Sequence, residues 1–448
     1  MMTLGEAAAA VGARTSGSDV RFLGVSSDSR SVGQGELFIA LRGERFDGHE
    51  FLAAARARGA AAAMVDRDYQ GPYPLPVLVV TDTRRALGEL ARSWRARFSP
   101  ALIAITGSNG KTTVKEMIAA VLRQHAGEAR VLATPGNLNN DIGVPLTLLR
   151  LRAEHRCCAI ELGMNHRGEI AYLASLAAPT IALVNNAQRE HLEFMGSVEE
   201  VAAENASVYD GLPPDGTAVV NADDAQAAYF RQRAAGRPVV DFGLERAMVR
   251  GGYVLKGLSS ELELHTPKGE ASATLSIPGL HNVRNALAAA ACAHAARIDA
   301  ATIAAGLSAF RPYTGRLQVK AGHGGVTVID DSYNANPDSV RAAIDVLASC
   351  DSPTALVLGD MGEVGPRGPE FHREIGAYAR GRGISQLLAL GDAAAHAVAA
   401  FGKGAQHFKD VPALLAALDA RTVLVKGSRF MRMERVVTAL TGATEGAH

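Results

Sequence analysis

Residues 101–113, read as ALIAITGSNGKTT, combine the residue types that bind a polyphosphate. The apolar run 101–105 predicts a buried strand of a parallel sheet, and residues 114–122 have the apolar spacing of a helix. Between them lies a Gly-rich turn that ends in Lys-Thr-Thr. A strand, a glycine turn and a helix in this order predict a phosphate-binding loop.

Each residue type in the turn has a physical reason to be there. Gly107 and Gly110 let the backbone approach an anion, and free N–H groups at the start of the helix point at it. Lys111 supplies a mobile positive charge, and Thr112 offers a hydroxyl to Mg²⁺. The pattern is GxxGKTT, with Ile105 where the longer form of the motif has its first glycine. The alternative is an ordinary Gly-rich turn between a strand and a helix.

Two further side chains follow predicted strands of the same sheet. Glu161 ends the strand predicted at 157–162, and His191 follows the strand predicted at 181–184. Parallel strands deliver such groups to one edge of a sheet. Together with Thr112 they would make a mixed magnesium site, although magnesium usually prefers oxygen ligands. The alternative is that Glu161 caps a helix and His191 is a solvated loop residue.

Five polar loops recur at strand ends or helix starts. They are GNLNNDIGVP at 136–145, GLHNVRN at 279–285, DDSYNANPDS at 330–339, GDMGE at 359–363 and KGSR at 426–429. The amides of 279–285 suit either a base edge or a helix cap, and composition favours the cap. The cations of 426–429 suit phosphate or carboxylate. Their recurrence is better evidence for a site than any one loop.

The elements that must position these loops alternate between strand and helix. Apolar runs predict strands at 37–41, 61–65, 77–80, 101–106, 157–162, 181–184, 218–221, 326–330, 355–359, 386–390 and 422–425. Helices are predicted at 51–57, 83–98 and 285–305, and residues 250–277 alternate like a small antiparallel insertion. Residues 310–315, FRPYTG, have the composition of a hinge.

We therefore expect an α/β protein of three domains. Residues 1–84 form a small N-terminal α/β domain. Residues 85–313 form a central domain with the phosphate-binding loop on a doubly wound, mostly parallel sheet. Residues 314–448 form a C-terminal Rossmann-like α/β domain.

Composition limits the class of protein. Lys plus Arg and Asp plus Glu both number 46, so the net charge is zero, which argues against a nucleic-acid or membrane-surface protein. Four cysteines without a CxxC pair argue against zinc and against a disulfide framework, and they fit a reducing cytoplasm. The N-terminus is a poor signal peptide, and no apolar run reaches membrane-spanning length.

Taken together, these motifs resemble those of the Mur ligases, the ATP-dependent amide-forming enzymes of peptidoglycan precursor synthesis. The shortened phosphate loop is the form this family uses. The resemblance covers nearly the whole chain and is carried by SDSR (27–30), GELFIALRGERFDGH (35–49), TGSNGKTT (106–113), TPGNLNNDIGVP (134–145), ELGMNHRGEI (161–170), GLHNVRNALAAA (279–290), GRLQ (315–318), DDSYNANPDS (330–339), LGDMGE (358–363) and VKGSR (425–429).

The resemblance implies an ATP- and Mg²⁺-dependent ligase that joins D-alanyl-D-alanine to UDP-N-acetylmuramoyl-tripeptide through an acyl phosphate. A cytoplasmic monomer without nucleic-acid partner or membrane insertion is expected, with a site completed by closure of the C-terminal domain. Alternatives are a folylpolyglutamate-type ligase, a relative that adds another amino acid, or a regulatory nucleotide-binding protein. The SDSR and FDGH stretches, expected to read UDP, argue against folate, and no NKxD guanine motif is present.

The resemblance also implies roles for particular residues. The catalytic group would be Lys111, Glu161, His191 and Arg316. The nucleotide would be held by Gly107, Ser108, Asn109, Gly110, Lys111, Thr112, Thr113, Asn282, Arg316 and Asp331, with Asn282 at the adenine and Asp331 at the ribose side. The other substrates would meet Ser29, Arg30, Gly48, His49, Asn137, Asn140, Asn336, Lys426 and Arg429. Magnesium would be held by Thr112, Glu161 and His191.

One position departs from the family pattern. Several relatives use a carbamylated lysine, after the loop that contains His191, to support a second magnesium. Asn205, beside Glu204, aligns there, and no lysine lies between Arg189 and Gly211. A carbamate is therefore not expected, and a water or Glu204 is left as the alternative support.

Overall fold

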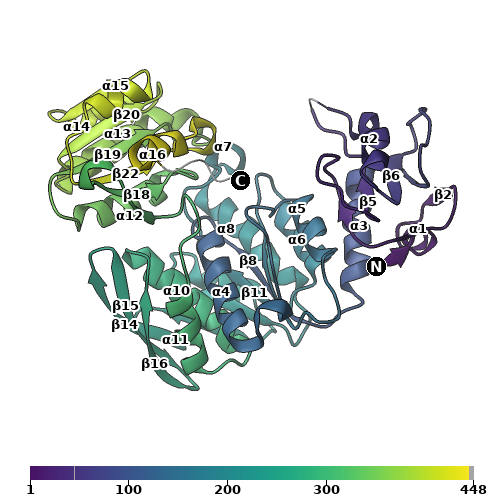
Figure 1. The fold of residues 1–448 in the computed structure, drawn as a ribbon. Helices are drawn as coiled ribbons and strands as arrows, with labels where there is room; N and C mark the ends of the chain where they lie inside the picture. The colour runs from purple at the N-terminus through teal and green to yellow at the C-terminus, as the bar shows by residue number, and fades with distance from the viewer. Residues whose placement is uncertain (45, 443–448) are drawn as a thin grey trace.

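A computed structural model describes residues 1–44 and 46–442. It contains three larger sheets that follow one another along the chain, as Figure 1 shows from the purple N-terminal part through the teal centre to the yellow C-terminal part. The predicted mixed α/β class is confirmed. The division into three domains stays a proposal, and its first boundary, between residues 84 and 85, falls inside helix α3 (Thr83–Arg95).

The N-terminal sheet has the order β2-β7-β6-β5-β4. Its strands are β2 (Arg14–Ser16), β4 (Val25–Ser26), β5 (Leu37–Ile39), β6 (Ala62–Asp66) and β7 (Val77–Val80). Pairing from β4 to β7 is parallel, and β2 is antiparallel to β7. Helices α1 (Leu4–Val11), α2 (Leu52–Ala57) and α3 accompany the sheet. The strands predicted at 37–41, 61–65 and 77–80 are thus present, the first two with shifted ends.

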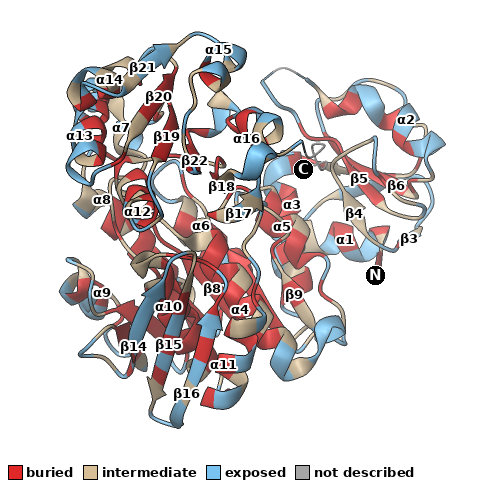
Figure 2. Cartoon of the chain, turned by 60° about the vertical axis from the view of Figure 1, so that its left-hand side comes forward, coloured by how far each residue is buried: buried red, intermediate tan, exposed pale blue. Residues whose placement is uncertain are grey.

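The central sheet carries the phosphate-binding loop and has the order β16-β15-β14-β13-β12-β11-β8-β10-β9. Strands β9 (Val131–Ala133), β10 (Cys157–Glu161), β8 (Ala101–Thr106), β11 (Ile181–Val184), β12 (Thr217–Asn221) and β13 (Val239–Gly243) run parallel. Strands β14 (Val249–Lys256), β15 (Ser259–Thr266) and β16 (Gly269–Leu275) then continue the sheet as the predicted antiparallel insertion. The insertion has a largely exposed face in Figure 2, whereas β8 is buried.

Helices on the central sheet are α4 (Lys111–Ala126), α5 (Gly143–Leu148), α6 (Glu169–Ala177), α8 (Val198–Ala206), α10 (Leu280–Ala295) and α11 (Ala300–Ala309). The single helix predicted at 285–305 is wrong, because α10 and α11 are separate. Arg297 has a left-handed φ of 67° between them, and the Asp299 side chain accepts from Thr302 N and caps α11. An N-cap residue has extended rather than helical backbone, so the helix cannot run through it.

The C-terminal sheet has the order β17-β18-β22-β19-β20-β21. Its strands are β17 (Gln318–Ala321), β18 (Thr327–Asp331), β19 (Thr354–Gly359), β20 (Gln386–Leu390), β21 (Ala405–Phe408) and β22 (Thr422–Lys426). All pairs are parallel except β17–β18. Helices α12 (Pro337–Ala348), α13 (Gly368–Gly381), α14 (Ala395–Phe401), α15 (Val411–Ala416) and α16 (Glu434–Thr441) accompany it.

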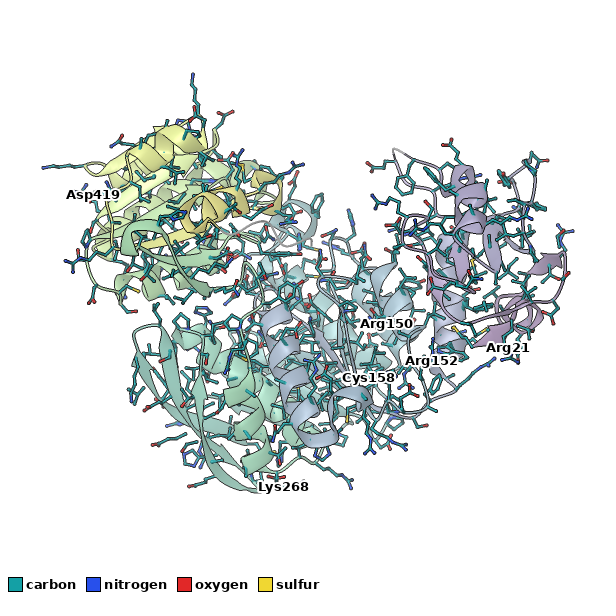
Figure 3. The ribbon with its side chains drawn as sticks, viewed as in Figure 1. Arg21, Arg150, Arg152, Cys158, Lys268 and Asp419 are labelled. Atoms are coloured by element: carbon teal, nitrogen blue, oxygen red, sulfur yellow. The ribbon has the colours of Figure 1, made fainter. Side chains whose placement is uncertain are left out.

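The three parts are held together by polar and apolar contacts. Arg152, labelled in Figure 3 between the central and N-terminal parts, donates from Nη2 to Leu23 O at 2.9 Å. On the other side, one apolar cluster continues from Val283 on α10 to Val346 on α12. None of the helices in residues 1–44 and 46–442 is long and apolar enough to cross a bilayer.

Candidate active site

The phosphate-binding loop has the backbone that its glycines predict. Gly107 has φ 132° and Gly110 has φ 83°, both in the region that favours glycine. A Cβ atom at Gly107 would lie 3.0 Å from Asn185 Cβ, so the loop is also tightly packed. Helix α4 starts at Lys111 without a side-chain cap, which leaves its first N–H groups for an anion.

Lys111 is not free in this loop. Its Nζ donates to Gly107 O at 2.7 Å and to Ser108 O at 3.3 Å, and it lies 3.1 Å from Glu190 Oε1. The side chains of Lys111 and Glu190 are only 14% and 11% exposed. The lysine charge is therefore neutralised by a carboxylate from the loop after β11.

Glu161 lies beside the loop because of sheet register. It pairs with Ile105 of β8, so the strand end brings its carboxylate next to Thr112. Oε1 accepts from Thr112 Oγ1 at 3.3 Å and from Asn139 Nδ2 at 2.7 Å, while the buried Oε2 has no hydrogen-bond partner. The residue is 1% exposed, and its carboxylate partners are side chains and not the N–H groups of a helix start, so the helix-capping alternative does not describe it.

These donors fit a magnesium ion. An unpartnered buried carboxylate oxygen next to a hydroxyl is the oxygen-rich surrounding that Mg²⁺ prefers. In the described part of the chain, no three His, Cys, Asp or Glu side chains form a metal-binding group. The predicted set combines the Thr112 hydroxyl with Glu161 and His191, and it stays a prediction.

His191 joins the central and C-terminal parts of the site. Its backbone is left-handed, with φ 51°. Its Nδ1 lies 2.7 Å from Glu363 Oε2, and its Nε2 lies 3.6 Å from Glu190 Oε1. The contact with His191 holds the pKa of the Glu363 carboxyl below its usual range. The imidazole is 11% exposed, so it is not a solvated loop residue.

These groups line one cavity of about 970 Å³. Of the residues predicted from the sequence, it is lined by Ser108, Asn109, Gly110, Lys111, Thr112, Asn137, Asn140, Glu161, His191, Arg316, Asn336, Lys426 and Arg429. The cavity thus collects the phosphate-binding loop, the polar loop before α5 and the cations of the C-terminal part.

The C-terminal wall is positively charged and ordered. Arg316 places its guanidinium 4.0 Å from the Tyr333 ring centroid, a cation–π contact. Asn336 caps α12 and also donates from Nδ2 to Asn109 Oδ1 at 2.8 Å, so it touches the phosphate-binding loop directly. The buried Lys426 is paired with the Asp331 carboxylate, and burial lowers the pKa of Lys426.

Several predicted residues lie outside this cavity. Gly107 belongs to the phosphate-binding loop and Thr113 to the first turn of α4, but neither lines the cavity, and Asp331 is bonded to Lys426. Asn282 is 2% exposed, and its Nδ2 donates to Pro278 O at 2.7 Å, while α10 begins after Gly279 without a side-chain cap, so the helix cap that composition favoured is not formed. Its contact with adenine stays a prediction.

The predicted UDP-binding residues lie in the N-terminal part, away from the cavity lining. Arg30 is exposed and pairs with Asp28 at 2.9 Å. His49 is 2% exposed, lies next to Asp47, and accepts from Asp66 N at 2.9 Å, so its ring supports the local fold. The roles of Ser29, Arg30, Gly48 and His49 stay predictions, and Arg45 in the same loop lies outside the described residues.

Sequence reasoning did not single out several cavity residues, among them Arg84, Asp141, Glu190 and Glu363. Arg84 and Asp141 pair across the junction of the N-terminal and central parts, with 2.6 Å between Nη2 and Oδ1. Glu190 and Glu363 line the cavity beside His191. Two signals in the sequence could have pointed to these glutamates. Glu190 is next to His191, and Glu363 lies in the acidic turn after β19. Sequence alone could not say that they face Lys111 and His191.

Asn205 is fully buried and structurally occupied. It accepts from Thr106 Oγ1 at 2.7 Å and donates from Nδ2 to Val201 O at 3.0 Å. Glu204 accepts from Gly168 N and Ile170 N, each at 2.8 Å, so its carboxylate is already bound to the start of α6. These contacts leave the Glu204 oxygens bound to backbone in this structure.

The loop, the Glu161 strand end and the cationic wall define a P-loop nucleotide-binding enzyme whose site lies between two α/β sheets. Three family descriptions match in succession: "Mur ligase family, catalytic domain" at residues 21–95, "Mur ligase middle domain" at 105–293, and "Mur ligase, glutamate ligase domain" at 315–429. The chain belongs to the Mur ligase family.

Curated and solved relatives agree with this assignment. The chain is 41% identical over 434 residues to UDP-N-acetylmuramoyl-tripeptide–D-alanyl-D-alanine ligase of Escherichia coli (strain K12), covering 95% of each protein. It is similar to the crystal structure of MurF from Acinetobacter baumannii, with a TM-score of 0.92, 34% identity and 99% coverage of both chains. It is also similar to MurF from Thermotoga maritima in complex with ADP, with a TM-score of 0.80, 25% identity, and 94% and 97% coverage.

Proposed function

We propose that this chain joins D-alanyl-D-alanine to the terminal carboxylate of UDP-N-acetylmuramoyl-tripeptide, at the expense of ATP, in peptidoglycan precursor synthesis. The names of the similar proteins support this function, since both substrates are printed for the Escherichia coli relative. The single observation that carries it is the cavity, in which Lys111 and Glu161 face Arg316 and Lys426.

The chemistry requires two anions to meet. A substrate carboxylate oxygen attacks the γ-phosphorus of ATP, the bond to ADP breaks, and an acyl phosphate forms. The dipeptide ammonium group loses one proton to water, and its nitrogen attacks the acyl carbon. The bond from that carbon to the phosphate oxygen then breaks, and phosphate leaves with the second proton as the amide forms. Lys111 and Arg316 lower the repulsion between the anions from opposite walls of the cavity. Bound magnesium, held by Thr112, Glu161 and His191, would supply further neutralisation of the phosphate charge.

The remaining roles are proposed on the same basis. Ser108, Asn109 and Gly110 hold the phosphates together with Gly107 and Thr113. The UDP moiety binds the N-terminal domain, residues 1–84, through Ser29, Arg30, Gly48 and His49, and the peptide lies along Asn137 and Asn140. Asn282 and Asp331 approach adenine and ribose, and Asn336, Lys426 and Arg429 receive the dipeptide. The enzyme acts as a cytoplasmic monomer, with one chain lining the cavity.

Phosphate release tests this function. Purified protein is assayed with ATP, Mg²⁺ and UDP-N-acetylmuramoyl-tripeptide, with and without D-alanyl-D-alanine. Release should depend on both substrates and fall to background in Lys111→Ala. A matched control is Lys256→Ala, because Lys256 pairs with Glu261 on the exposed insertion, outside the cavity lining. Release without either substrate would contradict the proposal and indicate a simple ATPase.

A further inference from the structure

The carboxylate of Glu190 occupies the position where the phosphate-binding lysine needs an anion. Lys111 Nζ lies 3.1 and 3.3 Å from its two oxygens, and the other bonds of the lysine are to neutral carbonyl groups. The three N–H donors of Lys111 are occupied by these oxygens, so a nucleotide phosphate that binds Lys111 competes with Glu190, the one anion among its partners. We therefore expect binding of the nucleotide to release Glu190.

The backbone around Glu190 is fixed, so the release concerns its side chain alone. Gln188 N donates to Ser108 Oγ at 2.9 Å, and Arg189 N donates to Asp338 Oδ2 at 2.9 Å. The Arg189 guanidinium is bound to Asp338 and Glu374 and is not available to neutralise the neighbouring carboxylate. Once Lys111 is taken, the remaining charged or titratable neighbour of the Glu190 carboxylate among the described residues is the His191 imidazole, whose Nε2 lies 3.6 Å from Oε1.

The other carboxylates that line the cavity keep their partners when Lys111 is taken. Asp141 is paired with Arg84. Glu161 is bound by Thr112 and Asn139. Glu169 accepts from the N–H groups of Asn165 and His166, and Glu363 lies against His191. Among the described residues that line the cavity, Glu190 is thus the carboxylate whose partner the nucleotide removes.

We propose that Glu190 is an exchange carboxylate that serves two cations in turn. It holds Lys111 while the phosphate site is empty, and after the nucleotide has taken the lysine it binds the ammonium group of the incoming amine substrate. This assignment rests on the proposed function, since it gives the amine of D-alanyl-D-alanine its counter-ion next to the reacting phosphate. A desolvated ammonium group requires such a partner.

Glu190→Gln tests the two parts of the proposal separately, namely the competition with nucleotide for Lys111 and the binding of the substrate ammonium group. The substitution removes the charge of the side chain while keeping its shape. Calorimetric titration with ADP and Mg²⁺, without other substrates, should give a Kd about three- to tenfold lower than in the wild type, since the nucleotide no longer competes with a carboxylate for Lys111. The KM for D-alanyl-D-alanine should rise about tenfold, with a smaller change in kcat. A residue that only supports the fold would not raise nucleotide affinity.

Glu193→Gln is the matched control, because Glu193 is exposed, three residues away, and not part of the cavity lining. It should leave the ADP Kd and the dipeptide KM unchanged. Glu190→Asp keeps the charge and should bring the dipeptide KM back toward the wild-type value. Thermal melts establish that each variant is folded before it is titrated.

Each outcome decides either the competition for Lys111 or the ammonium site. An unchanged or weaker ADP affinity in Glu190→Gln overturns the competition for Lys111. Tighter ADP binding with an unchanged dipeptide KM overturns the ammonium site. If the wild type does not ligate D-alanyl-D-alanine at all, the proposed function and the ammonium site fail together. The ADP titration, which needs no second substrate, still decides the first half.

Discussion

We expect Arg189 to hold the C-terminal part of the molecule against the central part, which carries the phosphate-binding loop. Removal of its side chain should weaken the docking of these two parts. The side chain starts from the loop after β11 and reaches two helices of the C-terminal part. Nη2 lies 2.6 Å from Asp338 Oδ1 on α12, and Nη1 lies 2.8 Å from Glu374 Oε2 on α13. The guanidinium also lies 5.3 Å from the Phe371 ring centroid. The same loop carries Glu190 and His191, so the clamp positions both.

The structure sets the size of the effect. The three charged side chains are 25%, 24% and 30% exposed, between a surface pair worth about 0–1 kcal/mol and a buried pair whose disruption costs about 3–5 kcal/mol. Glu374 keeps Arg341, and Asp338 keeps the backbone N–H of residue 189, so neither carboxylate is left alone. We therefore expect Arg189→Ala to weaken docking by about 2 kcal/mol, which is roughly 30-fold in the docking equilibrium.

Two measurements test the clamp. Small-angle scattering should show a larger radius of gyration for Arg189→Ala than for the wild type, and kcat/KM should fall roughly tenfold. Arg341→Ala is the control, because Arg341 contacts the same Glu374 at 3.0 Å from within the C-terminal part and does not join the two parts. The reasoning is refuted if Arg189→Ala keeps both the radius of gyration and kcat/KM of the wild type.

Three further predictions concern stability. Asn205→Ala should lower the free energy of unfolding by about 1–3 kcal/mol in urea titrations, because it leaves the buried Thr106 hydroxyl without its acceptor. Asp331→Asn should cost about 3–5 kcal/mol in the same titrations, because the fully buried ammonium of Lys426 loses its counter-ion. The arginines bonded to Glu374 hold the pKa of its carboxyl below its usual range. The stabilisation of the folded state by this carboxylate is therefore complete above its unfolded pKa of 4.5, and it is lost as the pH falls through the lower folded pKa. Thermal melts of the wild type and Glu374→Gln should therefore differ at neutral pH and converge in acid.

The sequence predicted those parts of the molecule whose signals are local. The glycines at 107 and 110 require a particular backbone, and the apolar runs of β8, β10 and β11 are long enough to be recognised. Strands β9 and β21 were missed because they are short and partly exposed, so they lack a clear pattern. The break at Arg297 was missed because alanine-rich sequence continues on both sides of it.

The site itself was harder to predict, because its contacts join residues far apart in the chain. Lys111 and Glu190 were each visible, yet nothing in the local pattern pairs them across 79 positions. Asn282 was assigned two possible roles, contact with adenine or a helix cap. The structure shows its Nδ2 bonded to Pro278 O, just before α10, and the contact with adenine stays a prediction.

The position of the cavity follows from the direction of the strands in two sheets. The carboxyl ends of β8 and β10 carry the phosphate-binding loop and Glu161, and the carboxyl ends of β18 and β22 carry Asp331 and Lys426. Both parallel sheets thus present the ends at which α/β proteins bind ligands, and they face each other across one cavity. The central edge supplies most of the carboxylates and the C-terminal edge supplies most of the cations, so neither edge alone balances the charge of an acyl phosphate. A site built this way depends on docking of the two sheets, which is why a clamp outside the cavity should change the rate of a reaction that it does not touch.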